Sequence, residues 1–277
     1  MTKPFLQRTI TAVFIVGIMT AGILSGGMTS WLLFLMIAGL CLTELKRLLI
    51  GNKLNWRAAM FIFTGLIPCL TGGFILYAPP AMAGYLTSIA LTTLLALWVF
   101  IWILAELLFP EKKPYATVRK AFFGFFYIGL PFSILPFMVQ IDGTYSAGLL
   151  FGFVALIWVF DSGSYVVGTT FGRTKIMPAV SPGKTWEGAL GGLVLAMAIS
   201  VLIYRVFDVL TEVDWLVVAV LTSVFGLLGD LVESSLKRHY QWKDSGSFLP
   251  GHGGMLDRFD SLIFAIPFTG AYLLFIA

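Results

Sequence analysis

Acidic side chains inside or at the ends of long apolar stretches are the residues of this sequence best suited to chemistry. A carboxylate is costly to place in a lipid-like environment, so one that is kept there has a partner or a function. Asp161 lies deepest, about 12 Å from the nearer end of its apolar segment at 1.5 Å per residue. The acids of this kind that we single out as candidates are Asp161, Glu187, Asp230, Glu233, Asp257 and Asp260.

Two pairs of these acids have helical spacing. Asp230 and Glu233 are three residues apart, as are Asp257 and Asp260, and residues three apart share a helix face. The segment 234–256 joins the two expected helices, so the four carboxylates can converge. Carboxylates that close repel one another unless a cation lies among them, and oxygen-only ligands favour a hard ion such as Mg²⁺.

Purely structural roles are the alternative for each acid. Asp257 could cap a helix, with Asp260 favoured by the dipole of the first turn. Asp230 and Glu233 end their helix, where the dipole disfavours negative charge, so they need a cation or a basic partner. Asp161 could pair with a buried lysine, although no predicted span interior contains one.

Two segments combine basic and flexible residues as phosphate sites do. The segment 234–256 contains Lys237, Arg238 and Lys243 and ends in a Gly-His-Gly-Gly run over 251–254. This run precedes a helix N-terminus, whose free N–H groups suit phosphate. Its His252 is a candidate for contacting phosphate or moving a proton. A second basic segment, 181–187, leads into another span. Binding of anionic lipid headgroups is the simpler alternative for both segments.

The elements that must position these residues are membrane-spanning helices. Apolar residues make up 58% of the 277 residues and charged residues only 12%, where soluble domains carry about 25%. This composition excludes an ordinary soluble enzyme and a soluble nucleic-acid-binding protein. Two cysteines, Cys41 and Cys69, lie in apolar stretches as small hydrophobic residues. Nine segments are near spanning length: 9–25, 29–44, 58–78, 83–109, 120–139, 145–169, 186–207, 214–233 and 258–276.

Lysine and arginine mark one side of this arrangement. Of the 18 basic residues, all except Arg205 fall at the N-terminus or in alternate loops. Because cytoplasmic loops concentrate basic residues, we expect a cytoplasmic N-terminus and an external C-terminus. The candidate acids then lie toward the cytoplasmic side. The sequence thus predicts an all-α, polytopic membrane protein whose residues 1–277 form a single membrane domain. Two pairs of glycines four residues apart, Gly148 with Gly152 and Gly188 with Gly192, have the spacing that lets helices approach closely.

The stretch Ser234–Asp260 resembles a family signature. It reads Ser-x-Leu-Lys-Arg-x₄-Lys-Asp-x-Gly-x₂-Leu-Pro-x-His-Gly-Gly-x-x-Asp-Arg-x-Asp and is similar to that of phosphatidate cytidylyltransferases, or CDP-diacylglycerol synthases. The pieces Asp161–Tyr165, Phe171–Arg173 and Ser181–Glu187 are also similar to that family, in which many members have lysine where Gly183 stands. The resemblance covers roughly 155–265, which we therefore expect to contain the cytidylyltransferase site.

The resemblance implies the reaction of CTP with phosphatidate to give CDP-diacylglycerol and pyrophosphate, at the cytoplasmic side of a bacterial inner membrane, by a homodimer. Asp230 and Asp257 are expected to bind Mg²⁺, with Glu233, Asp260 and Asp161 completing its surroundings. The groups expected to act on the phosphates are Lys237, Arg238, Lys243, Arg258 and His252. The residues expected to contact substrate are Ser181, Lys184, Thr185, Ser234, Gly253 and Gly254.

Two other functions use similar residues. A CTP-dependent lipid or polyprenol kinase could have such a site, but it would release CDP and attach no cytidine to lipid. An ion-coupled transporter also needs acids within its spans, although it would place them near the middle of the bilayer and would not need a phosphate-binding loop.

Overall fold

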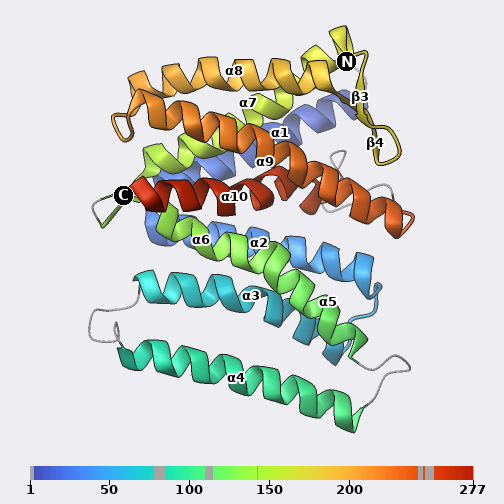
Figure 1. Cartoon of the computed structure of the whole chain (residues 1–277). Helices are drawn as coiled ribbons and strands as arrows, with labels where there is room; N and C mark the ends of the chain where they lie inside the picture. The colour runs from blue at the N-terminus through green and yellow to red at the C-terminus, as the bar shows by residue number, and fades with distance from the viewer. Residues whose placement is uncertain are drawn as a thin grey trace.

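A computed structural model describes residues 3–77, 85–109, 115–141, 143–242, 246 and 253–276, and gives only the backbone of 3–10, 85–92, 94, 96 and 141. The described chain is α-helical apart from two short antiparallel ribbons, and its helices run side by side (Figure 1). In chain order the elements are α1 (Lys3–Leu24), α2 (Gly27–Leu49), α3 (Trp56–Tyr77), α4 (Tyr85–Leu108), α5 (Ala116–Gly124), the π-helix η2 (Phe125–Gly129), α6 (Leu130–Met138), β1 (Gln140–Ile141), β2 (Thr144–Tyr145), α7 (Ala147–Phe171), β3 (Lys175–Met177), β4 (Ser181–Thr185), α8 (Trp186–Val206), α9 (Glu212–His239) and α10 (Leu256–Ile276).

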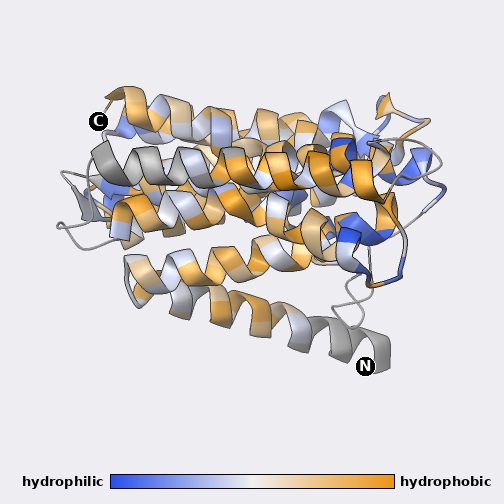
Figure 2. Cartoon of the chain, turned by 90° about the horizontal axis from the view of Figure 1, so that it is seen from below, coloured by the Kyte–Doolittle hydropathy of each residue, from blue (hydrophilic) through white to orange (hydrophobic). Residues whose placement is uncertain are grey.

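The nine predicted helices are confirmed within the described residues, because α5, η2 and α6 form one continuous span, Ala116–Met138. Seven of the nine are long and apolar enough to cross a membrane, and α1 and α4 contain the shorter apolar stretches Thr11–Leu24 and Leu97–Leu108. Figure 2 shows hydrophobic residues along the helices and hydrophilic residues gathered toward their ends. Many large apolar side chains face outward, as lipid contact requires. The chain is a multi-span membrane protein.

Two helices extend five or six residues beyond their predicted C-terminal ends, where basic residues follow an apolar run. The second predicted span stopped at 44, whereas α2 continues to Leu49 and includes Lys46 and Arg47. The eighth stopped at 233, whereas α9 continues to His239 and includes Lys237 and Arg238. Basic side chains in a last helical turn are favoured by the helix dipole, so these charges extend the helix instead of ending it.

Small residues bring α7 and α8 together, an approach that the four-residue glycine spacing permits. Gly188 lies against Gly168, and Gly192 against Gly163, so a side chain added at either α8 position would meet the backbone of α7. Gly152 packs against the Trp215 ring of α9. As Figure 1 shows, α7–α10 lie together at one side of the molecule and α4 at the opposite edge. Both cysteines are buried and free, as predicted.

Candidate active site

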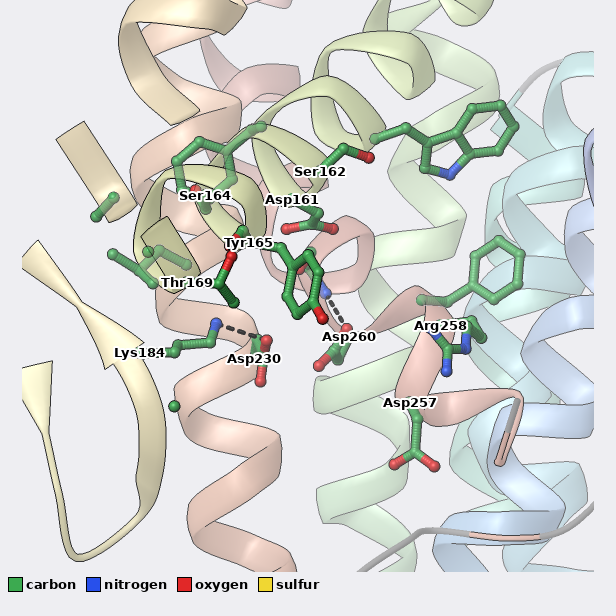
Figure 3. Close-up of a pocket in the computed structure, with 18 of the residues that line it drawn as sticks. Asp161, Ser162, Ser164, Tyr165, Thr169, Lys184, Asp230, Asp257, Arg258 and Asp260 are labelled. Atoms are coloured by element: carbon green, nitrogen blue, oxygen red, sulfur yellow. Dashed lines mark hydrogen bonds and ion pairs between the residues drawn. The ribbon is translucent and has the colours of Figure 1, made fainter. Parts of the chain in front are cut away.

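A cavity of about 800 Å³ lies among α1, α7, β4, α9 and α10. Four of the five predicted metal-binding acids line it: Asp161 from α7, Asp230 from α9, and Asp257 and Asp260 from α10. Figure 3 shows Asp161, Asp230 and Asp260 facing the same space. The fifth, Glu233, is buried and does not line the cavity.

Lys184 and Asp230 form an ion pair that is open to the cavity, here called the Lys184 group. The ammonium of Lys184 lies 2.5 Å from Oδ2 of Asp230, and the side chains are 21% and 33% exposed. The Ser234 hydroxyl donates a hydrogen bond to Oδ1 of Asp230 at 3.1 Å. Asp230 thus has the basic partner that its place near the end of α9 required.

A second lysine lies between two acids, and we call these three residues the Lys237 group. The Lys237 ammonium is 2.5 Å from Oε2 of Glu233 and 2.7 Å from Oδ1 of Asp257. The exposed fractions of these side chains are 14% for Lys237, 1% for Glu233 and 12% for Asp257. The Gly254 N–H donates to the other Asp257 oxygen at 2.8 Å. The group ties the end of α9 to the start of α10 and leaves Glu233 compensated.

The other two acids differ in their access to the cavity. Asp260 is buried, and its Oδ1 accepts a hydrogen bond from the Ser261 N–H at 2.7 Å. Asp161 is exposed to the cavity, and Arg258 contributes a cationic side chain to the same lining. Among the described residues, no three acidic, histidine or cysteine side chains are already arranged as a metal centre. The oxygen-only donors at the cavity nevertheless suit a hard divalent cation, provided that Lys184 moves from Asp230.

The β3–β4 ribbon carries Lys184 to the cavity and is fixed to the start of α8. The Thr185 hydroxyl caps α8 by accepting the Gly188 N–H at 3.2 Å, so this predicted substrate contact also has a structural role. The Glu187 carboxylate accepts the N–H groups of Arg173 and Thr174 at 3.0 and 3.1 Å. These bonds hold the ends of the ribbon together.

The remaining predicted contacts that the structure describes do not line the cavity. Ser181, Arg238, Gly253 and Gly254 are described but do not line it. Arg238 is exposed and donates to the Val180 carbonyl at 3.3 Å. Gly253 has φ +84°, which favours glycine. The predicted contacts Lys243 and His252 lie outside the described residues.

Sequence reasoning missed several residues near the site. Ala12, Ile15 and Val16 of α1 line the cavity, and nothing in their apolar pattern separates them from lipid-facing residues. Tyr165 of α7 lines it too, although the family resemblance included this residue without a role. Glu44 is fully buried at the junction of α2 and α10. The signal for Glu44 was its position as the last residue of an apolar segment.

Comparison with known proteins places this architecture in a family. The model of the cytidylyltransferase family matches residues 6–276. The chain is 33% identical to the phosphatidate cytidylyltransferase of Staphylococcus haemolyticus over 269 residues, which cover 96% of this chain and 98% of the relative. It is 46% identical to that of Bacillus subtilis over 145 residues, 51% of this chain and 53% of the relative. The chain therefore belongs to the cytidylyltransferase family, as a full-length homologue of phosphatidate cytidylyltransferases.

Proposed function

We propose that this chain transfers CMP from CTP to phosphatidate, giving CDP-diacylglycerol and pyrophosphate for phospholipid synthesis. The observation that carries the proposal is the cavity among apolar helices, which is lined by four acidic residues, Lys184 and Arg258. Acids suited to a divalent cation and bases suited to phosphate are the two requirements of nucleotidyl transfer. Full-length similarity to phosphatidate cytidylyltransferases supplies the substrates.

We assign Mg²⁺ to the carboxylates at the cavity, Asp230 and Asp257 with Asp161 and Asp260. Their oxygens suit this ion, and their mutual repulsion favours a cation among them. Glu233 is better assigned to holding Lys237, because its carboxylate is buried on that ammonium away from the cavity. Bound Mg²⁺ would neutralise phosphate charge and polarise the α-phosphoryl group.

The protein's own residues then need to orient and neutralise the phosphates. A phosphatidate oxygen bonds to the α-phosphorus of CTP as the bond from that phosphorus to the pyrophosphate oxygen breaks. Since the attacking phosphate is already ionised, no strong base is required. Lys184 and Arg258 line the cavity and offset charge on the lipid phosphate and the departing pyrophosphate. Lys237 adds a further positive charge next to Asp257.

We place the site at the cytoplasmic side of a bacterial inner membrane. The support is the distribution of basic residues, all of which except Arg205 lie at the N-terminus or in alternate loops. CTP then reaches the cavity from the cytoplasm and phosphatidate from the membrane. Residues 155–265 supply the chemical groups within one membrane domain, and the family resemblance further implies a homodimer.

The reaction is tested with CTP carrying one label in cytidine and another in the γ-phosphate. Detergent-purified protein is given phosphatidate and Mg²⁺, and both labels are followed. We expect cytidine in the lipid phase and γ-label in pyrophosphate in equal amounts, with both lost on chelation. Release of CDP with the γ-label in lipid would indicate a kinase instead. Absence of any turnover by folded protein would contradict the proposal.

A further inference from the structure

Glu44 is an acidic residue that lies outside the cavity and is almost completely buried, at 1% exposure. It is located near the C-terminal end of α2, where the dipole of its own helix disfavours negative charge. A charge buried in this position requires compensation from another part of the protein. One such partner comes from an element that packs against α2.

That element is α10. Oε2 of Glu44 accepts a hydrogen bond from the Leu256 N–H at 2.8 Å, across 212 residues of sequence. Leu256 is the first residue of α10 and is itself buried. The positive end of the α10 dipole favours a carboxylate here, and the N–H would otherwise be a buried donor at a helix start. Glu44 thus acts as a cap on α10 that α2 provides.

The same carboxylate also contacts the loop that precedes α10. A side chain added at Gly246 would collide with Oε1 of Glu44, so the backbone at this position comes directly against the carboxylate. One side chain of α2 therefore contacts both Gly246 within the loop and Leu256 at its end. The next residues, Asp257 and Arg258, and Asp260 one turn into the helix, all line the cavity.

We propose that Glu44 is a positioning residue: by holding the start of α10 and Gly246 before it, its carboxylate sets where Asp257, Arg258 and Asp260 stand at the cavity. This inference rests on the proposed function, because those three residues are the groups assigned to the metal and phosphates. It also gives the N-terminal half of the chain a part in the reaction, through a contact rather than through a catalytic group.

Glu106 provides a matched control. It is also a buried carboxylate of the N-terminal half, at 4% exposure, but its Oε1 accepts a hydrogen bond from Nε of Arg57 at 3.3 Å and holds α4 to α3. Methionine has a similar length to glutamate and no strong acceptor, so Glu44→Met and Glu106→Met remove equivalent buried charges. Glu44→Gln keeps an oxygen that can accept the Leu256 N–H.

The experiment measures kcat and KM for CTP together with hydrogen exchange of peptides covering 253–260. We expect Glu44→Met to lower kcat by about tenfold or more, since a small displacement of reacting groups is enough for such a loss. Its KM for CTP should change less, and exchange at the start of α10 should accelerate. Glu44→Gln should recover most of kcat, and Glu106→Met should stay within about twofold of the original, as expected of a distant site.

Gly246→Ala keeps the proposal testable if Glu44→Met does not fold. Its added methyl should press on the carboxylate and lower kcat, and this loss should shrink in the Glu44→Ala background, where the methyl has room. Folded Glu44→Met with the original kcat, or with a reduced kcat but unchanged exchange over 253–260, would overturn the inference. Additive losses in the double variant would also overturn it. If the unmodified protein makes labelled CDP-diacylglycerol, any of these outcomes counts against the role of Glu44 alone.

Discussion

Each of the two lysine-centred groups of the site pairs one ammonium with carboxylates, but the two groups differ in how far their side chains are exposed. In the Lys184 group the ion pair is partly exposed and borders the cavity. In the Lys237 group one ammonium is enclosed by two acids, of which Glu233 is 1% exposed. A partly solvated pair can exchange partners with a ligand at little cost, whereas breaking an enclosed pair leaves a buried charge. We infer that the first group binds substrate. In the second, Lys237 holds α9 to α10 through Glu233 and Asp257, and Asp257 also lines the cavity.

Asp230→Asn should produce the largest effect, because it removes one of the charges assigned to Mg²⁺ while keeping the shape of the side chain. We expect turnover to fall about a thousandfold, equivalent to several kcal/mol of transition-state stabilisation. The melting temperature in detergent should change little. Asp208→Asn, at an exposed position before α9, is the matched control and should retain turnover. Near-normal turnover of folded Asp230→Asn would make the metal assignment wrong.

Lys237→Ala should mainly reduce stability, because it leaves the buried Glu233 carboxylate without its cation. Loss of one partner of a buried pair costs about 3–5 kcal/mol of unfolding free energy. Denaturant or thermal unfolding in detergent measures this loss. Adding Glu233→Gln removes the uncompensated charge and should restore part of the stability. A stable single variant, or a double variant no more stable than the single, would remove the distinction between the groups.

Lys184→Ala should show the reverse pattern. Its ion pair is partly exposed, so we expect a stability loss of at most about 1 kcal/mol. Activity should fall about 10- to 100-fold, as expected when one charge that stabilises phosphoryl transfer is removed. Steady-state kinetics with varied CTP, beside unfolding measurements, checks both parts. Loss of stability comparable with that of Lys237→Ala would show that the two groups do not differ as described.

Glu187→Gln should give the smallest effect, confined to the Lys184 group. It weakens the hydrogen bonds to the Arg173 and Thr174 N–H groups that fix the β3–β4 ribbon. Because this carboxylate is exposed to solvent, we expect a change of only about fivefold in KM for CTP. Steady-state kinetics of the variant measures this change in KM. The stability of Lys237→Ala should be the same with and without Glu187→Gln. An unchanged KM would mean that the ribbon does not position Lys184.

Much of the fold could be predicted because hydropathy and charge report directly on membrane spans. The nine helices follow from apolar segments, and the acids at their ends marked the site. The two extensions, to Leu49 and His239, were missed because basic residues were interpreted as loop rather than as the last turns of helices. The two short ribbons have too few residues to give a hydropathy pattern.

Partners within the site could not be predicted, since they depend on how helices pack. Lys184 reaches Asp230 from a ribbon 46 positions earlier, and Glu44 reaches Leu256 across most of the chain. Spacing within one segment reveals a shared helix face, as for Asp230 and Glu233, but it does not reveal that separate lysines contact them. The part of the cavity wall that α1 contributes could not be predicted either, because its residues are as apolar as those that face lipid.

Binding of a paramagnetic divalent ion tests the central claim most directly, because it does not require turnover. Mn²⁺ in place of Mg²⁺ is titrated into detergent-purified protein with CTP, and free Mn²⁺ is quantified by electron paramagnetic resonance. We predict saturable binding by the original protein and by Asp208→Asn, and binding at least about tenfold weaker in Asp230→Asn, since even indirect ligand contacts cost that much affinity. Equal Mn²⁺ binding by folded Asp230→Asn would contradict the assignment of the cation to this cavity.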